Sequence, residues 1–345
     1  MTRWLVTGGC GFIGSHFLRL LLAERPEAAV CNLDALTYAG RPENVAEFGA
    51  DPRYRFVKAD VADAAAVEAA FGGFAPDVVV HFAAETHVDR SLGDAGAFVR
   101  TNALGTQVLL AAARRLDVKR FVQVSTDEVY GSLAAPARAA GDAPLAPSSP
   151  YAASKAAADL LVLAAVHSFA LPAVITRGAN TYGPNQFPEK LLPLAIANAL
   201  AREPIPLYGD GGNERDWLYV EDHCRGVLAA AERGCAGAIY NLGGSGGLSN
   251  RELLERLLDL LERPRELIRP VPDRPGHDRR YALDSTRARR ELGWEPQVAL
   301  DAGLRRTVEW YGTHAAWLAA VRDADFDAYY RRQYGSLDSS RAAKP

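Results

Sequence analysis

Short apolar runs alternate with longer amphipathic segments along the first half of the chain. Six of these runs have the character of buried strands: RWLVTG, AAVCNLD, RYRFVKAD, DVVVHFAA, RFVQVST and PAVITRG. Segments with helical periodicity follow most of them, among them GSHFLRLLLAE and NALGTQVLLAAARRL. Strands that helices cover on both faces are apolar throughout, so this rhythm predicts an α/β fold with a doubly wound parallel sheet.

The pattern changes after about residue 178. Three later segments, GPNQFPEKLLP, ALAREPIPLYGDGGN and PVPDRPGHD, are rich in proline, glycine and charge, which is typical of loops. We therefore expect a sheet domain over residues 1–178, rejoined by about 214–242, and a smaller mixed α/β lobe that binds the substrate over 179–213 and 243–330. The last residues, 331–345, have little to bury and are expected to form a mobile tail.

Composition and charge narrow the classes of function. The 345 residues are 48% hydrophobic and 23% charged, with a formal net charge of −3, as in an ordinary globular protein with a large core. Lysine and arginine are scattered, so nucleic acid and anionic membranes are poor candidate partners. The first strand begins within a few residues of the N-terminus, and no apolar run has membrane-spanning length, so we expect a cytoplasmic protein.

The four cysteines, Cys10, Cys31, Cys224 and Cys235, lie far apart in the sequence. They form no C-x-x-C pair, and no histidines stand at metal-ligand spacing. The sequence therefore predicts neither a structural zinc site nor a disulfide framework, and no metal.

The segment VTGGCGFIGSH joins the first predicted strand to its helix and places Gly8, Gly11 and Gly14 three residues apart. The first glycine allows a tight turn, the second lets a pyrophosphate approach the backbone, and the third lets the helix pack closely on the strand. A glycine-rich turn without a ligand is the alternative. The context of a strand, a helix and Asp34 twenty residues after Gly14 favours a dinucleotide site.

Asp34 also indicates which dinucleotide would bind. A carboxylate at the end of the second strand accepts hydrogen bonds from the ribose hydroxyls and repels a 2′-phosphate, so NAD is favoured over NADP. The alternative for Asp34 is a cap on a helix or turn.

The segment YAASK places Tyr151 and Lys155 four residues apart after Pro150, which suits a helix start. Both side chains then lie on one face of the helix. An ammonium group beside a phenol lowers the phenol pKa, which makes Tyr151 a candidate base for an alcohol proton. The alternative is an ordinary amphipathic helix that carries this pair by chance.

The segment VSTDEVYGS, residues 124–132, places Asp127 and Glu128 directly after a predicted buried strand. Two close carboxyl groups resist double ionisation, so one of them can stay protonated while the other is charged. The alternative is that the pair caps the following turn or faces solvent, because adjacent residues on regular structure point apart.

Taken together, the chain resembles the extended short-chain dehydrogenase/reductase superfamily, and within it the dTDP-glucose 4,6-dehydratases. The resemblance runs from Thr7 to about Tyr311 and rests on GGCGFIGSH, DALTYAG, HFAAETHVDRS, TNALGT, VSTDEVYG, PYAASK, NTYGPNQFPEKLLPL, PLYGDGGNERDWLYVEDH and DRPGHDRRYALD. It implies a Rossmann domain with bound NAD. Related epimerases and decarboxylases carry small residues where this chain has Asp127 and Glu128.

The resemblance also implies a reaction. NAD oxidises C4 of the hexose while Tyr151, assisted by Lys155, takes the hydroxyl proton and Thr126 hydrogen-bonds the same oxygen. Glu128 then removes the C5 proton and Asp127 protonates the departing C6 hydroxyl. Hydride returns to C6, which leaves a 4-keto-6-deoxy sugar nucleotide.

The resemblance implies binding residues as well. Those expected to contact the cofactor are Gly8, Gly11, Phe12, Ile13, Gly14, Asp34, Asp60, Val61, Ala83, Ala84, Tyr151 and Lys155. Those expected to contact the nucleotide sugar are His87, Asn180, Glu189, Lys190, Leu191, Pro206, Tyr208, Arg215, Asn250, Arg274 and His277. A structural imidazole is the alternative for His87, and a solvated charge is the alternative for Lys190 or Arg274.

The chain departs from the pattern of this family at a few positions. Gly178 and Ala179 stand where Cys and Ser are more frequent, Thr181 stands where a second Asn is frequent, and Thr86 replaces Ser. Thr86 is a conservative change, whereas Thr181 removes an amide contact near the sugar.

Other functions stay open at this point. A UDP-glucose 4,6-dehydratase differs by one methyl group of the base, worth about 1–3 kcal/mol in a pocket. An epimerase or decarboxylase on the same scaffold would not lose water. A non-catalytic NAD-binding regulator belongs to a different class, and it would have no need of Thr126, Asp127, Glu128, Tyr151 and Lys155 together.

Two helical segments, TNALGTQVLLAAARRL and YAASKAAADLLVLAAVHSF, have broader apolar and alanine-rich surfaces than one sheet face requires. We expect them to pair with their copies in a homodimer by four-helix packing.

Overall fold

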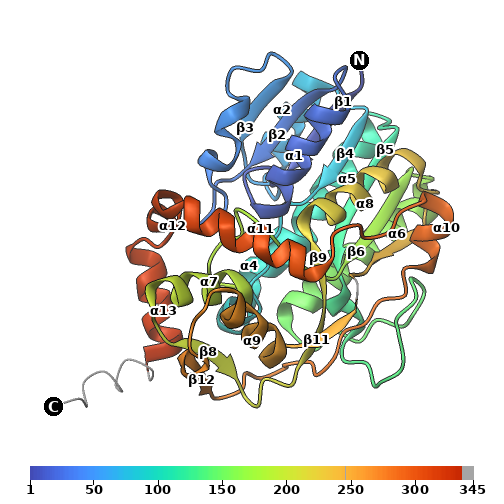
Figure 1. The fold of residues 1–345 in the computed structure, drawn as a ribbon. Coiled ribbons are helices and arrows are strands. Elements are labelled where there is room, and N and C mark those ends of the chain that lie inside the picture. The colour runs from blue at the N-terminus through green and yellow to red at the C-terminus, as the bar shows by residue number, and fades with distance from the viewer. Residues whose placement is uncertain (245, 336–345) are drawn as a thin grey trace.

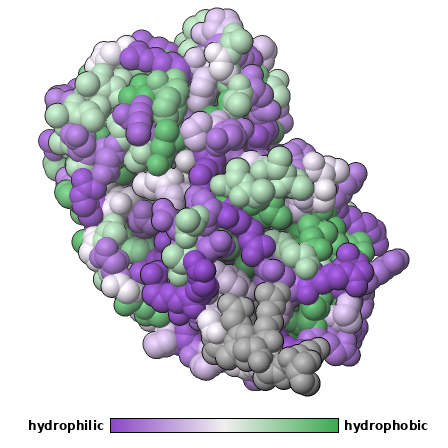
Figure 2. Space-filling view, turned by 90° about the vertical axis from the view of Figure 1, so that its left-hand side faces the viewer, coloured by the Kyte–Doolittle hydropathy of each residue, from purple (hydrophilic) through white to green (hydrophobic). Residues whose placement is uncertain are grey.

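The computed structural model describes residues 1–244 and 246–335. Figure 1 shows a central sheet flanked by helices, with a second, smaller group of helices and short strands below it. The face in Figure 2 mixes hydrophilic and hydrophobic residues, and hydrophilic ones predominate where the upper and lower parts meet.

The central sheet has seven parallel strands in the order β10-β6-β5-β4-β1-β2-β3. They are β1 (Arg3–Thr7), β2 (Ala29–Asp34), β3 (Tyr54–Lys58), β4 (Val78–His81), β5 (Arg120–Thr126), β6 (Ala173–Gly178) and β10 (Ile239–Leu242). This result confirms the six predicted strands and the doubly wound α/β class. The seventh strand, IYNL, returns from the later part of the chain to the edge of the sheet.

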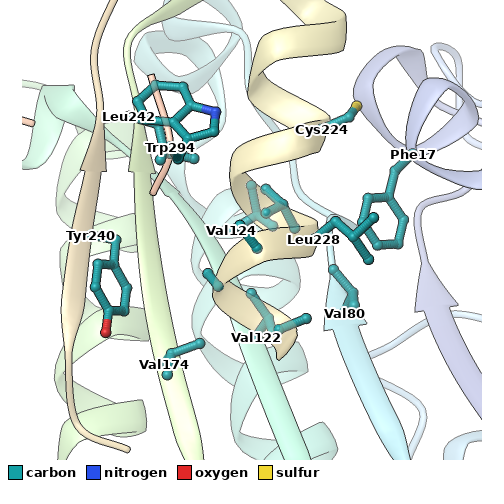
Figure 3. Close-up of a cluster of buried hydrophobic side chains, with 14 of the residues drawn as sticks. Phe17, Val80, Val122, Val124, Val174, Cys224, Leu228, Tyr240, Leu242 and Trp294 are labelled. Carbon is teal, nitrogen blue, oxygen red and sulfur yellow. The ribbon is translucent and has the colours of Figure 1, made fainter. Parts of the chain in front are cut away.

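Helices cover both faces of this sheet. One face carries α1 (Phe12–Glu24) and α8 (Val220–Arg233), and the other carries α2 (Ala64–Phe74), α5 (Gly105–Arg115) and α6 (Pro150–Phe169). Figure 3 shows Phe17 of α1 and Leu228 of α8 above Val80 and Val122 of the sheet. Because side chains alternate along a strand, Val79 and Phe121 point to the opposite core under α2, α5 and α6.

Helix α6 begins as the sequence predicts. The Ser149 hydroxyl accepts a hydrogen bond from the backbone N–H of Ala152, and Pro150 occupies the first turn, where no N–H is needed. By length and composition alone, α6 is the one described helix that could span a membrane. In the structure it packs against β5, β6 and α5, as a core helix does.

The smaller lobe is mixed α/β. Its sheets have the orders β11-β9-β7 and β12-β8, and comprise β7 (Asn180–Tyr182), β8 (Ile205–Tyr208), β9 (Glu214–Tyr219), β11 (Gly247–Ser249) and β12 (Ile268–Val271). Its helices are α7 (Leu191–Ala201), α9 (Asn250–Leu260), α11 (Leu300–Thr313), α12 (Ala315–Val321) and α13 (Ala324–Tyr334), while α10 (Thr286–Leu292) packs on α8 and β10. A separate core joins α7, α9 and α11.

Short helical segments connect the larger elements. They are η1 (Pro42–Phe48), α3 (Val88–Gly93), α4 (Ala95–Phe98), the π-helical η2 (Val99–Leu104), η3 (Asp127–Tyr130) and η4 (Arg265–Leu267). The predicted helix NALGTQVLLAAARRL thus begins in η2 and continues as α5.

The expected mobile tail requires a correction at its start. Helix α13 continues to Tyr334, whose ring is buried and packs against the ring of Tyr208, with centroids 6.1 Å apart. The first residues of the segment 331–345 therefore have tertiary contacts that their polar composition did not reveal. Residues 336–345 lie outside the described part of the chain.

Candidate active site

A cavity of about 410 Å³ lies where the carboxyl ends of the central strands face the smaller lobe. Residues that end or follow β1, β2, β3, β4, β5 and β6 all line it. The chain reverses its direction across the sheet between β1 and β4, and ligands of doubly wound sheets bind at such a switch point. Every cofactor, catalytic and substrate residue predicted from the sequence lines this one cavity.

The glycine segment forms a close-packed turn beside the cavity. Gly8 has a φ of +72°, and a Cβ atom there would lie 2.6 Å from the backbone nitrogen of Ala83. A Cβ atom at Gly14 would lie 2.2 Å from the carbonyl oxygen of Gly8. At Gly11 a Cβ atom would lie 3.2 Å from the carbonyl oxygen of Gly8, a tight contact, so the turn is closely packed at the start of α1 as well. This cradle fits the pyrophosphate of a dinucleotide.

Asp34 forms the turn cap that was the alternative considered for it, and its predicted contact with a ribose stays a prediction. Its carboxylate accepts hydrogen bonds from the backbone N–H groups of Cys10 (2.9 Å) and Leu36 (2.8 Å), so it caps the turn, and it also lines the cavity. Burial raises the pKa of Asp34, and the two N–H donors oppose that effect. Farther along the same wall, Asp60 forms an ion pair with Arg100.

Asp127 and Glu128 open η3, directly after β5. The Thr126 hydroxyl accepts a hydrogen bond from the backbone N–H of Glu128 (3.2 Å) and donates one to the Asp127 carboxyl (3.2 Å). The tight turn of this 3₁₀ segment lets both acidic residues line the cavity, although they are adjacent in sequence. The alternative that the pair faces solvent does not hold.

The surroundings of the two carboxyl groups differ. Burial and the neighbouring charge of Glu128 raise the pKa of Asp127 well above its ordinary value, which favours the protonated acid. Burial also raises the pKa of Glu128, but the positive charges of Lys190, Arg274 and Arg215 favour its ionised form. The surroundings therefore favour the protonated form more strongly at Asp127 than at Glu128.

Tyr151 and Lys155 lie on the buried side of α6, one turn apart. The Lys155 ammonium donates a 2.7 Å hydrogen bond to the carbonyl oxygen of Val124, and burial lowers its pKa to about 8. The sequence predicts a lowered pKa for Tyr151, whereas in the described chain burial and the charge of Glu128 raise it. A hydrogen bond with Thr126 acts in the opposite direction.

The end of the cavity in the smaller lobe is lined by cations and aromatic rings. Asp89 accepts hydrogen bonds from Arg274 Nη1 (2.8 Å) and from the Tyr208 hydroxyl (2.9 Å). Gln333 donates to that hydroxyl (2.7 Å), and Tyr334 completes the wall. Asp89 and Tyr334 were not predicted as site residues. The aspartate stands in the motif HFAAETHVDRS, whereas no motif marks the tyrosine.

Glu189 and His87 line the cavity, but their polar atoms are already paired. The Glu189 carboxylate accepts hydrogen bonds from the Tyr38 hydroxyl (2.7 Å) and from Arg90 Nε (2.9 Å). The His87 ring bonds the backbone oxygen of Glu189 through Nε2 (3.0 Å), and its edge packs against Tyr329. Both side chains therefore stabilise the wall, and their predicted contact with the nucleotide sugar stays a prediction.

Thr181, one of the departures from the pattern, forms a polar pair with His223. The distance from its Oγ1 to the histidine Nδ1 is 2.8 Å, and the same hydroxyl donates to the backbone oxygen of Ala179 (3.1 Å). Several buried polar atoms on the cavity wall have no hydrogen-bond partner within the described residues: Asp127 Oδ2, Asn180 Oδ1, His223 Nε2, Asn250 Oδ1 and Arg274 Nε. Because buried polar groups are normally paired, these atoms indicate a polar ligand.

Within residues 1–244 and 246–335, no group of three or more histidine, cysteine, aspartate or glutamate side chains could hold a metal ion. In the same ranges all four cysteines are free thiols.

The chain matches known proteins over nearly its whole length. The family model of GDP-mannose 4,6 dehydratase matches residues 5–307. A dTDP-glucose 4,6-dehydratase of Streptomyces griseus is 53% identical, with 92% of this chain and 96% of the relative covered. One of Xanthomonas campestris pv. campestris is 46% identical, with 94% of this chain and 97% of the relative covered.

Solved structures give the same result. The dTDP-glucose 4,6-dehydratase DesIV of Streptomyces venezuelae, crystallised with NAD bound, is 49% identical and superimposes with a TM-score of 0.90 over 93% of this chain and 100% of that chain. A UDP-glucose 4-epimerase of Thermus thermophilus in complex with NAD is 35% identical, with a TM-score of 0.85 over 91% of this chain and 100% of that chain. The chain therefore belongs to the NAD-dependent epimerase/dehydratase superfamily and, within it, to the dTDP-glucose 4,6-dehydratase family.

Proposed function

We propose that this protein converts dTDP-glucose to dTDP-4-keto-6-deoxyglucose and water, with NAD as its cofactor. The relatives and the DesIV structure support the substrate and the cofactor. The observation that carries the reaction type is the pair Asp127 and Glu128, which line the same cavity as Tyr151. The pKa of Asp127 is raised well above its ordinary value, whereas three cations oppose the rise in the pKa of Glu128. An acid and a base side by side suit the elimination of water.

The cofactor is held by the backbone of the glycine turn, by Asp34 and by the Lys155 ammonium. Bound NAD would supply the hydride acceptor for C4 and the hydride donor for C6 of the hexose, and the positive charge of its oxidised ring would favour an ionised Tyr151. Asp34 accepts hydrogen bonds from ribose hydroxyls, while its charge disfavours a 2′-phosphate.

Tyr151 takes the proton of the C4 hydroxyl, and Thr126 hydrogen-bonds the same oxygen. The Thr126 hydroxyl is already fixed by the N–H of Glu128, so it presents a defined orientation to the substrate. Lys155 keeps a positive charge near the phenol and stabilises its ionised form.

Glu128 removes the proton from C5, which the C4 ketone makes acidic, and Asp127 donates its proton to the C6 hydroxyl so that water leaves. Lys190, Arg274 and Arg215 favour the carboxylate form of Glu128 before this step. After elimination Glu128 returns a proton to C5. Asp127, with Oδ2 free of any described hydrogen-bond partner, is ready to contact the leaving oxygen.

The nucleotide diphosphate lies at the end of the cavity in the smaller lobe. Arginine forks match phosphate oxygens, and both Arg215 and Arg274 line this end. The Tyr208 ring supplies an aromatic face for the base. Asn180, Lys190, Leu191, Pro206, Asn250 and His277 complete the predicted contacts.

One experiment tests this function directly. Purified protein is incubated with dTDP-glucose or with UDP-glucose, and the mass of the sugar nucleotide is followed. We expect loss of one water from dTDP-glucose. Faster conversion of UDP-glucose would show that the preferred nucleotide carries uracil rather than thymine. A product of unchanged mass would indicate an epimerase. No conversion of either substrate would contradict a dehydratase.

We also propose that two copies associate through α5 and α6. Large apolar side chains stay exposed along this side of the molecule: Leu92, Val99, Leu104, Leu116, Leu160 and Phe169. An apolar strip of this kind is unusual on a free surface. We further propose that the protein acts in the cytoplasm, in agreement with the four unpaired thiols. Cell fractionation tests the location.

A further inference from the structure

Behind the cavity, α6 and β6 bury a group of charges for which the proposed reaction has no use. Asp159 and Arg177 are almost completely inaccessible to solvent, and Arg177 Nε donates a 2.9 Å hydrogen bond to the Asp159 carboxylate. A buried ion pair is costly to desolvate and is no guarantee of stability. Its position in the fold therefore needs another explanation.

Asp159 stands one helical turn after Lys155 on the same side of α6. The Lys155 side chain is itself buried, and its ammonium contacts the backbone oxygen of Val124 rather than a carboxylate. An ammonium group in such a place tends to lose its proton, because burial penalises the charged form. A carboxylate one turn away opposes that tendency.

We propose that Asp159, held by Arg177, is a positioning residue that keeps Lys155 charged beside Tyr151. This inference rests on the proposed function only where it concerns turnover, because the charge state of Lys155 can be measured without substrate.

The other groups around Lys155 do not supply this negative charge. His81 of β4 is buried between the hydroxyls of Thr7 (2.7 Å) and Thr106 (3.2 Å). Burial and the charge of Lys155 lower its pKa to about 3, so it stays neutral at working pH. Tyr151 of α6 is neutral as well, since burial raises its pKa.

The remaining charged groups are directed elsewhere. Asp127 and Glu128 of η3 lie on the substrate side, where the Glu128 charge interacts with Lys190, Arg274 and Arg215. Asp159 is the charged group that raises the pKa of Lys155 against the larger effect of burial.

Arg177 fixes the carboxylate in place from β6. Its Nη1 donates to the carbonyl oxygen of Gly141 (3.2 Å), and its guanidinium carbon lies 4.7 Å from the centre of the Tyr130 ring. The Tyr130 hydroxyl in turn donates to Asn241 Oδ1 (2.8 Å) on β10. Asp159 is therefore hydrogen-bonded to a cation that has further contacts of its own, and it stands one helical turn from Lys155. Arg177 cannot lose its proton in this range of pH, so Lys155 is the member of the group that titrates.

The chain has only five lysines, Lys58, Lys119, Lys155, Lys190 and Lys344, so their titration can be followed singly. Protein labelled with ¹³C at lysine Cε is titrated by NMR, and Lys155→Arg assigns the signal of Lys155. We expect the wild-type Lys155 pKa to be about 8. In Asp159→Asn it should fall by about 1–3 pH units, the usual effect of a close opposite charge.

Three further variants separate this effect from folding. Asp159→Glu should restore the Lys155 titration. Asp159→Asn with Arg177→Met removes both charges and should recover the thermal stability that the single variant loses, yet leave the Lys155 pKa low. Glu232→Gln breaks the bidentate pair of Glu232 with Arg25 on the surface (2.7 and 2.9 Å) and should change nothing at Lys155.

A second experiment measures C4 oxidation during a single turnover of dTDP-glucose. In Asp159→Asn the rate of C4 oxidation should decline at a lower pH than in wild type, by the same shift as the Lys155 signal. An unchanged Lys155 pKa in Asp159→Asn would overturn the inference. So would a wild-type pKa in the double variant, because that result would leave the pair a purely structural role. If wild-type protein does not oxidise dTDP-glucose, the proposed function fails while the NMR titration still decides the role of Asp159.

Discussion

The Tyr38 hydroxyl donates a 2.7 Å hydrogen bond to Oε1 of Glu189 and so joins two distant parts of the cavity wall. Tyr38 belongs to the loop after β2, and the neighbouring residues Thr37, Ala39 and Gly40 line the cavity next to Asp34. Arg90 packs against the same pair, with its guanidinium carbon 4.0 Å from the centre of the Tyr38 ring. The hydrogen bond between Tyr38 and Glu189 thus connects the loop after β2 with the segment that leads into α7.

We expect the protein to be purified with NAD bound and Tyr38→Phe to release that NAD faster. The variant keeps the aromatic ring against Arg90 and loses only the hydrogen bond to a carboxylate, worth about 1.5–3 kcal/mol. Roughly tenfold faster release is therefore expected, measured by exchange with labelled NAD. Tyr240→Phe is the matched control, because its hydroxyl bonds Glu291 on α10 (3.0 Å), away from the cavity. Equal release rates in the two variants would show that the hydrogen bond between Tyr38 and Glu189 does not retain the cofactor.

Asp34→Asn should weaken NAD binding roughly 10- to 100-fold, because a hydrogen bond to a charged acceptor contributes about 1.5–3 kcal/mol, and should reduce discrimination against NADP. The asparagine keeps an acceptor for only one of the two backbone N–H groups of the turn, so a small loss of stability is expected. Asp34→Ala should have the same effect on the cofactor and also lower the melting temperature, because the N–H groups of Cys10 and Leu36 lose their acceptor. Titration of cofactor-free protein with both dinucleotides gives the ratio of the dissociation constants for NADP and NAD. A ratio unchanged in both variants would remove Asp34 from the site.

The sheet and the position of the cavity could be predicted from the sequence because both follow from local patterns. Apolar runs mark the strands, and the motifs at their carboxyl ends meet at one edge of a parallel sheet. The hydrogen bond between Tyr38 and Glu189 could not be predicted, since the two residues lie 151 positions apart and no sequence pattern marks either as the partner of the other.

Two further features depended on tertiary packing. The raised pKa of Tyr151 follows from its burial and from the charge of Glu128, which outweigh the hydrogen bond with Thr126. Tyr334 reaches the cavity because α12 and α13 fold back along the smaller lobe, where Phe326 packs on Phe187 with ring centroids 6.0 Å apart. The polar sequence around Tyr334 does not predict that α13 packs against the smaller lobe.

Light scattering should give twice the chain mass of 37.2 kDa at micromolar concentration. Leu160→Glu places a charge on the exposed side of α6, where 56% of the leucine is accessible, and should yield monomers. Phe56→Glu on the edge strand β3 is the control and should leave the dimer intact, because three strands separate β3 from β5, on which α6 packs. A monomeric wild type would exclude the proposed dimer.

Asp127→Asn should slow the loss of water by about 10² to 10⁴, the usual contribution of a positioned acid. Because the wild-type group acts in its protonated form, dehydration should decline as pH rises through the raised pKa of Asp127, and this decline should be absent from the variant. Exchange of the C5 proton with solvent should persist, since Glu128 is intact. The measurements are water loss by mass and deuterium uptake at C5 across pH. Normal dehydration in the variant would assign Asp127 a structural role.

Glu128→Gln should interrupt the reaction one step earlier. The amide keeps the size of the side chain but cannot take the C5 proton, so deuterium uptake at C5 should fall by about 10² to 10⁴. Oxidation at C4 depends on Tyr151 and Thr126, so single-turnover absorbance of the reduced cofactor should still appear. The variant also removes a charge that raises the pKa of Tyr151, and C4 oxidation should therefore extend to lower pH. If Glu128→Gln exchanges C5 at the wild-type rate, the base must be another group, and the elimination proposed for this cavity loses its first proton acceptor.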